Sequence, residues 1–224
     1  MAAETEHIRE FTTSGSFVIP NAPQLYIEVI GGGGGGGGGA GGRLELYLDI
    51  GSEVAAGDVI NYKVGQGGSP GQDGTTSQVT FGNYQLVAEG GVGGKNGTVN
   101  QGGRQGQGGD IIITAPTNRE EAELLDRARH FGSMYGESGG PGSDNGIGGF
   151  GGNDRYSGGD MARYTFGQLT PAQPGQSGSL NGSGGGGGGG GAAEMAAFQN
   201  SPHLPSTQGA MGGQGAPGVI RLRW

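Results

Sequence analysis

Alternating apolar and polar residues predict a series of β-strands in the first ninety positions. The clearest stretches are 24–30 and 43–49, in which every second residue is leucine, isoleucine or valine. A period of two places these side chains on one face of a strand and leaves the other face polar. The Gly82–Asn83 pair between two such stretches predicts a hairpin. The further predicted strands are 8–11, 16–19, 59–64, 78–81, 84–88 and 218–224.

One helix is predicted, over residues 118–131. Thr117 and Glu120 have the spacing of a capping box, and a proline precedes them. Acidic residues fill the first turn and basic residues the last, as the helix dipole favours. The residues expected to share one face of this helix are Leu125, Ala128 and Phe131.

Glycine interrupts this pattern on a large scale. The chain has 59 glycines among 224 residues, including the uninterrupted tracts 31–39 and 184–191. Ordering nine glycines costs roughly 10–20 kcal/mol of backbone entropy, at about 1–2 kcal/mol each. The tracts are therefore either flexible linkers or segments that specific contacts hold. The first tract lies between two strands that need a common register, which favours the ordered alternative.

These elements predict an all-β fold in a single domain that covers 1–224. We expect an antiparallel, jelly-roll-like β-sandwich formed by 8–88 together with 218–224, so that both chain ends lie in the same sheets. Residues 89–217 are expected to form glycine-rich loops, with the α-helix as an insertion.

Charge and composition exclude several functions. The formal net charge is −8, and the sequence pI is about 4.8. An acidic chain lacks the basic surface that nucleic acids and anionic membranes require, so neither is an expected partner. No stretch is long and apolar enough for membrane insertion, and the N-terminal residues lack the apolar core of a signal peptide. The expected site of synthesis is a cytosol, without export by a standard signal.

No motif supports catalysis, a cofactor or a metal. Residues 136–140 match G-x-S-x-G around Ser138, but they follow the predicted helix and not the strand that a nucleophile elbow requires. The chain has no cysteine, and its histidines, His7, His130 and His203, lack ligand spacing. We therefore expect a protein that is not an enzyme.

Several segments together resemble a known family. Residues 11–20 lead through 27–31 into polyglycine, and the order and spacing of the later glycine-flanked strands are similar to those of glycine-rich domains in bacteriophage tail-fibre proteins and some bacterial surface proteins. Residues 99–183 depart from that family because they contain a helix and several aromatics. The other segments that carry the resemblance are 57–68, 71–83 and 215–224.

The resemblance implies that polyglycine packs as extended helices with three residues per turn. Such a helix has no internal hydrogen bonds, so its N–H and C=O groups are free to pair with neighbours. At about 3.1 Å per residue, the two tracts reach roughly 28 and 25 Å. We therefore expect 31–39 and 184–191 to lie alongside each other.

The resemblance also implies a function. It predicts a structural protein of a phage virion, at the tail or fibre tip, that attaches to the host cell through non-covalent receptor binding. The implied partners are other virion proteins and a glycan or protein of the host surface, with a homotrimer as the expected assembly. The alternatives are a virion decoration or adaptor that touches no receptor, and a bacterial surface or ice-binding protein.

Aromatic residues in the irregular middle are the candidate receptor contacts. Tyrosine combines a large apolar ring with a polar group, which suits recognition at a surface. The alternative is that these rings are the packing anchors of a glycine-rich region. The candidates are Tyr135, Phe150, Tyr156, Tyr164 and Phe166.

Overall fold

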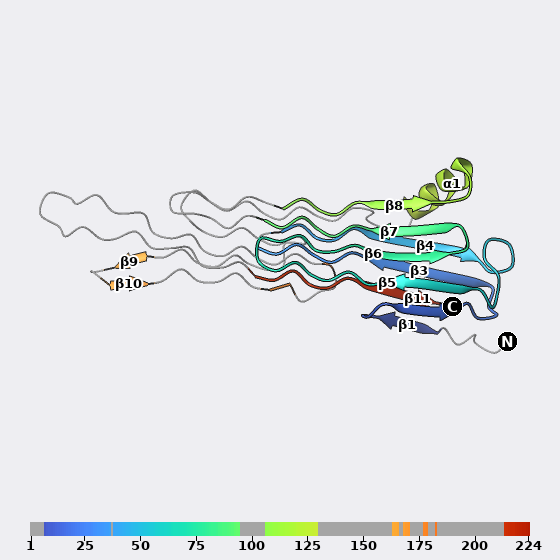
Figure 1. The fold of residues 1–224 in the computed structure, drawn as a ribbon, viewed down its shortest axis with the longest axis horizontal. Coiled ribbons are helices and arrows are strands. Elements are labelled where there is room, and N and C mark those ends of the chain that lie inside the picture. The colour runs from blue at the N-terminus through green and yellow to red at the C-terminus, as the bar shows by residue number, and fades with distance from the viewer. Residues whose placement is uncertain are drawn as a thin grey trace, which may run out of the picture.

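The chain folds as a β-sandwich from which glycine-rich segments project at one end (Figure 1). The computed structural model describes residues 7–36, 38–94, 106–129, 163–165, 168–170, 177–178, 182 and 213–224. Two antiparallel sheets, one of four strands and one of five, pack face to face. This architecture confirms the predicted all-β sandwich.

The four-stranded sheet joins the two ends of the chain. Its strand order is β1-β11-β3-β4, so the C-terminal strand lies between the first strand and the third. The predicted incorporation of both chain ends into one sheet is therefore confirmed. The strands are β1 (Ile8–Phe11), β11 (Val219–Arg223), β3 (Gln24–Ile30) and β4 (Arg43–Asp49).

The five-stranded sheet is mostly a meander, with the order β2-β5-β6-β7-β8. The Gly82–Asn83 turn joins β6 to β7, with Phe81 opposite Tyr84, as the sequence predicts. Within this sheet, the edge strand β8 was not predicted from the sequence. The strands are β2 (Gly15–Val18), β5 (Val59–Lys63), β6 (Ser77–Phe81), β7 (Tyr84–Ala88) and β8 (Ile111–Thr114).

The core lies between the two sheets and consists of the alternating apolar residues. Strands β3 and β4 turn every second side chain inward, and these are leucine, isoleucine or valine, which is why a period of two marks these strands in the sequence. The largest fully buried side chains are Ile19, Leu25, Ile27, Val29, Leu44, Leu46, Leu48, Ile60, Val79, Leu86, Ile220 and Leu222.

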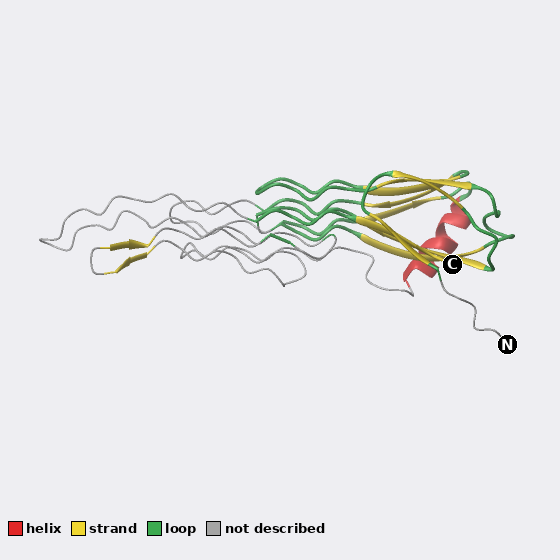
Figure 2. Ribbon diagram, turned by 90° about the horizontal axis from the view of Figure 1, so that it is seen from below, coloured by secondary structure: helices red, strands yellow, loops and turns green. Residues whose placement is uncertain are grey.

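Helix α1 (Asn118–Arg129) closes one open side of the sandwich (Figure 2). It packs against β4 and β8, which are edge strands of different sheets. Leu124 and Ala128 of the helix are buried in the core. Covering edge strands removes the unpaired backbone groups that would otherwise invite aggregation.

The N-terminus of α1 is the predicted capping box. The Glu120 amide donates to Thr117 Oγ1 at 3.2 Å, and the Thr117 amide donates to Glu120 Oε2 at 3.1 Å. This reciprocal pair satisfies two backbone donors that the first turn leaves without helical partners.

Aromatic rings close the opposite side, where β1 and β2 form the two outer strands. The Phe11 ring lies 4.4 Å from that of Tyr62, and the Phe17 ring lies 5.0 Å from that of Trp224. His7 stacks on Trp224, and their backbones exchange two hydrogen bonds of 2.9 and 3.0 Å. Trp224, which directly follows β11, therefore also covers the core on this side.

The strands continue directly into glycine-rich segments at the end of the sandwich opposite α1 (Figure 1). These segments leave from both sheets and run side by side. They are 31–36 after β3, 39–42 before β4, 65–69 after β5, 72–75 before β6, 89–94 after β7, 106–110 before β8 and 213–218 before β11.

Segment 31–36 hydrogen-bonds with a period of three. Its six amides donate in turn to three neighbouring segments, with N···O distances of 2.9–3.0 Å, and each neighbour receives every third amide. This is the pattern expected of an extended helix with three residues per turn. The amides of residues 31 and 34 donate to the carbonyls of 42 and 39, respectively. Those of 32 and 35 donate to 75 and 72, and those of 33 and 36 donate to 216 and 213.

Other segments complete a ring around 31–36. The carbonyls of Gly32 and Gly35 accept from Gly91 and Gly94, and that of Gly33 accepts from Gly68. Gly182 then closes the ring, because its carbonyl accepts from Gly41 and its amide donates to Pro217 O, each at 2.8 Å. All residues from 31 to 36 are buried. Polyglycine packing is therefore confirmed for the described tract.

The tract 31–39 is not one extended rod, however, so the predicted reach of 28 Å is wrong. The Gly34 amide donates to Gly39 O and the Gly31 amide to Gly42 O, both at 2.9 Å, so the chain reverses and returns antiparallel to itself. Gly36 has a φ of 67°, a left-handed conformation that suits glycine at such a reversal. Tract 184–191, its predicted neighbour, lies outside the described residues.

Side chains are excluded from the bundle interior by direct backbone contact. A Cβ atom on Gly32 would lie 2.1 Å from Gln66 O, and one on Gly39 would lie 1.9 Å from Gln107 O. Most non-glycine residues on the outer segments occupy exposed positions, often three apart, whereas the small side chains of Ala40 and Ala216 are buried. The exposed pairs are Gln66 and Ser69, Gln72 and Thr75, Gln107 and Asp110, and Gln214 and Pro217.

Replacing one interior glycine should destabilise the whole domain. We expect Gly39→Ala to lower the free energy of unfolding by at least about 3 kcal/mol, because backbone atoms cannot yield to the added methyl group as a side chain can. The matched control is Ala40→Gly in the next position, where a Cβ is already accommodated. It should cost at most about 1 kcal/mol. Chemical denaturation measures both, and equal effects would contradict the packing.

Two adjacent leucines of α1 test whether this helix closes the open side of the sandwich. Leu124 is 4% exposed, whereas Leu125 is only half-buried. We expect Leu124→Ala to cost about 2–4 kcal/mol, through lost burial and the cavity left behind, and Leu125→Ala about half as much or less. Thermal unfolding of the two variants makes the comparison. A larger effect at Leu125 would show that the helix packs on a different face.

Candidate functional site

Of the predicted receptor contacts, the structure places only Tyr164. It lies in β9 (Arg163–Thr165), opposite Leu169 of β10 (Gln168–Thr170). This two-stranded hairpin lies far from the sandwich, beyond the described glycine segments (Figure 1). The other candidates, Tyr135, Phe150, Tyr156 and Phe166, lie outside the described residues.

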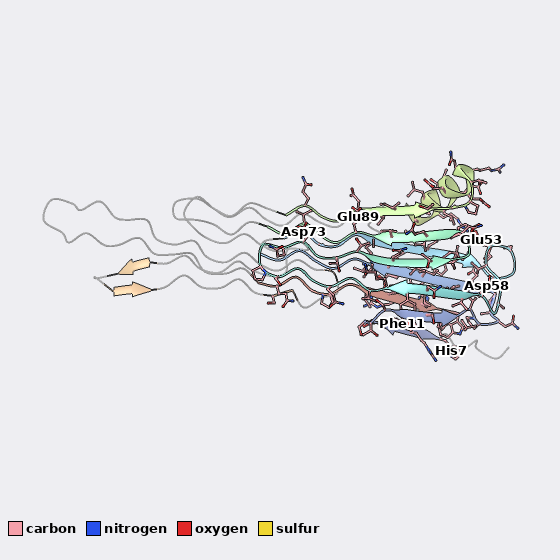
Figure 3. The ribbon with its side chains drawn as sticks, viewed as in Figure 1. His7, Phe11, Glu53, Asp58, Asp73 and Glu89 are labelled. Carbon is pink, nitrogen blue, oxygen red and sulfur yellow. The ribbon has the colours of Figure 1, made fainter. Side chains whose placement is uncertain are left out.

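A cleft of about 520 Å³ lies at the opposite end of the molecule, between α1 and the sandwich. Glu53, one of its lining residues, lies at the end away from the glycine bundle (Figure 3). The floor is apolar and aromatic and the rim is acidic. The lining residues are Leu48, Ser52, Glu53, Phe81, Tyr84, Glu120, Glu123, Leu124, Asp126 and Arg127.

Ion pairs across the cleft position part of its rim. The Arg127 guanidinium binds the carboxylate of Glu53, with Nη1 3.2 Å from Oε2, and this pair ties α1 to the loop after β4. Glu123, which also lines the cleft, pairs with Arg119 of the same helix at 2.8 Å, and the two side chains are 60% and 88% exposed. Exposed pairs of this kind contribute little to stability and exchange partners readily.

Burial and the surrounding negative charge affect the pKa of the tyrosine in the cleft. Burial raises the pKa of Tyr84, and the nearby carboxylates of Glu120 and Glu53 raise it further. Its hydroxyl also hydrogen-bonds with Glu120. Tyr84 stacks on the buried ring of Phe81, with centroids 5.2 Å apart. The cleft therefore combines a fixed aromatic surface with a negative potential.

The outer face of the four-stranded sheet carries a row of alternating charges. Glu28 is 3% exposed and lies between two arginines. Arg221 Nη1 donates to its Oε2, and Arg43 Nη2 lies beside its Oε1, each at 2.8 Å. Arg221 and Arg43 also pair with Glu10 and Glu45. This row ties β1, β11, β3 and β4 together, and a buried carboxylate needs such pairing.

A second row on that face is aromatic. The Arg223 guanidinium lies over the Tyr26 ring, 4.7 Å from its centroid, and binds the Tyr47 hydroxyl. Burial raises the pKa of Tyr26, and the carboxylates of Glu28 and Glu45 add to the effect. These side chains satisfy one another across three strands, so we assign them to the stability of the sheet.

Sequence reasoning missed the cleft because its residues come from distant segments. Glu53, Tyr84 and Glu123 are brought together only by the position of α1 across two sheet edges. A usable signal was the run Ile111–Thr114, whose β-branched residues predict the strand that places the helix.

Two further properties concern the described residues. No three of their histidine, aspartate or glutamate side chains gather in a way that could hold a metal ion. Among the helices in this part of the chain, none combines the length and apolar character needed to span a bilayer.

Comparison with known proteins supplies a family. No individual curated protein matches the sequence. A family model described as a glycine-rich domain matches residues 12–224. The match includes every strand of the sandwich except β1, and it includes every described segment of the bundle. The chain therefore belongs to the glycine-rich domain family.

Proposed function

We propose that the chain is a structural component of a bacteriophage particle, at the tail or fibre tip, that attaches the particle to the host cell. Attachment is non-covalent and involves no chemical step. The proposal rests on the resemblance of the sequence to tail-fibre domains and on the geometry of the glycine bundle.

The observation that carries the proposal is the common direction of the glycine segments. Segments from both sheets leave the sandwich at one end, and the β9–β10 hairpin lies beyond them (Figure 1). A scaffold of this form holds loops at a distance from its own core. Because backbone hydrogen bonds join every described segment to its neighbours, the loops start from fixed positions.

Rigid presentation has a thermodynamic advantage. A loop that is held in place loses less conformational freedom on binding, so more of the contact energy appears as affinity. Several copies on one particle add avidity without requiring a strong single contact. The aromatic residues proposed as contacts, Tyr164 among them, suit this role since they offer large areas with few rotatable bonds.

Binding to bacterial cells tests the proposal directly. Labelled protein is incubated with a panel of strains, and bound protein is measured by flow cytometry. We expect saturable binding to one strain or a few, and competition with phage adsorption on those strains. A variant in which Tyr135, Phe150, Tyr156, Tyr164 and Phe166 are serine should bind at least about 100-fold more weakly, which corresponds to about 2.7 kcal/mol.

The matched control replaces apolar side chains that are exposed on the sandwich. Ile8→Ser and Val18→Ser alter sandwich residues that are 63% and 59% exposed. This variant should bind as the unaltered chain does. Failure to bind any strain on which such a phage grows would favour a purely structural role in the virion, and depression of the freezing point by the protein would favour ice binding.

A further inference from the structure

We propose that the cleft between α1 and the sandwich docks a basic side chain, lysine or arginine, of a neighbouring protein in the particle. This inference rests on the proposed function, because it assigns a role to the end of the molecule that would face away from the host. Glu53, which lines the cleft, lies at the end of the molecule away from the glycine bundle (Figure 3).

The lining of the cleft suits a side chain with an apolar stem and a charged end. Its volume of about 520 Å³ lies within the range of ligand sites, about 300–1,000 Å³. Leu48, Leu124 and the aromatic pair of Phe81 and Tyr84 line it with apolar surface. The methylene groups of lysine or arginine pack well against such a surface while the charged group stays at the rim.

The charge of the cleft selects the sign of its partner. The carboxylates of Glu53, Glu120, Glu123 and Asp126 line it, and Arg127 is the guanidinium among the lining residues. Arg127 is paired with Glu53 and Arg119 with Glu123, and the four carboxylates outnumber these two guanidiniums, so the cleft is negative overall. A cation placed over the Tyr84 ring would be attracted by both the ring and the carboxylates.

The molecule itself shows how a guanidinium is held here. Arg127 reaches Glu53 through both terminal nitrogens, which is the bidentate geometry that arginine forms with carboxylates. Glu123 lies one turn before Arg127 on the helix, and its present partner, Arg119, is 88% exposed. An incoming arginine can therefore replace Arg119 at little cost in stability.

A pair of short peptides tests the proposal. The probe is acetyl-Gly-Arg-Gly-amide, and its neutral counterpart carries citrulline in place of arginine. Both are titrated into the full chain while methyl NMR signals are recorded. We expect the arginine peptide to shift Leu48 and Leu124, with no shift at Val18 and Val92, which are exposed elsewhere. The citrulline peptide should shift none of them.

Variants of the rim complete the test. Glu123→Gln combined with Asp126→Asn should weaken binding of the arginine peptide at least about fivefold, whereas the control Glu121→Gln, on the same helix but outside the cleft, should leave it unchanged. Added salt should weaken binding as well. Equal shifts from citrulline, shifts spread over the whole surface, or no shifts at all would overturn the proposal. None of these measurements uses host cells, so they stand apart from the test of attachment.

Discussion

The structure depends on one constraint: a backbone amide inside the glycine bundle must find an oxygen acceptor, in most cases a carbonyl, on a neighbouring segment. An extended helix with three residues per turn makes no hydrogen bonds of its own, so a buried segment of this kind is stable only when neighbours surround it. Segment 31–36 meets the constraint through a complete ring of partners. The partners can approach closely enough because a Cβ on Gly32, for example, would lie 2.1 Å from a carbonyl oxygen.

This constraint explains how a sandwich becomes a bundle. Between the sheets, side chains such as Leu46 and Leu86 fill a core that keeps two facing sheets about 10 Å apart. Beyond Ile30 the side chains disappear, and strands of different sheets bond directly to each other. Gly42, which precedes β4, donates to Glu89 O, which follows β7. Side chains therefore separate the two sheets in the sandwich. In the bundle, the lack of side chains lets segments from the two sheets join through backbone hydrogen bonds.

Sequence reasoning succeeds where the pattern is local. The period of two identifies β3 and β4, the Gly82–Asn83 pair identifies a hairpin, and Thr117 with Glu120 identifies the start of α1. It fails where partners are remote. The tract 31–39 predicts a single extended helix, but the chain reverses near Gly36, where the amides of 31–36 donate to carbonyls of 213–216 and 72–75. The cleft has the same origin, since Glu53 and Arg127 are 74 positions apart.

Amide hydrogen exchange of the tract tests the central claim most directly. The amides of Gly32, Gly33, Gly39 and Gly42 donate to carbonyls in other segments at 2.8–3.0 Å and lie in buried backbone. If these bonds hold the bundle together, the four amides exchange as slowly as those of the core strands β3 and β4, through global unfolding. Exchange at the rate of an unstructured glycine, while β3 and β4 stay protected, would contradict the account and make the tract a linker.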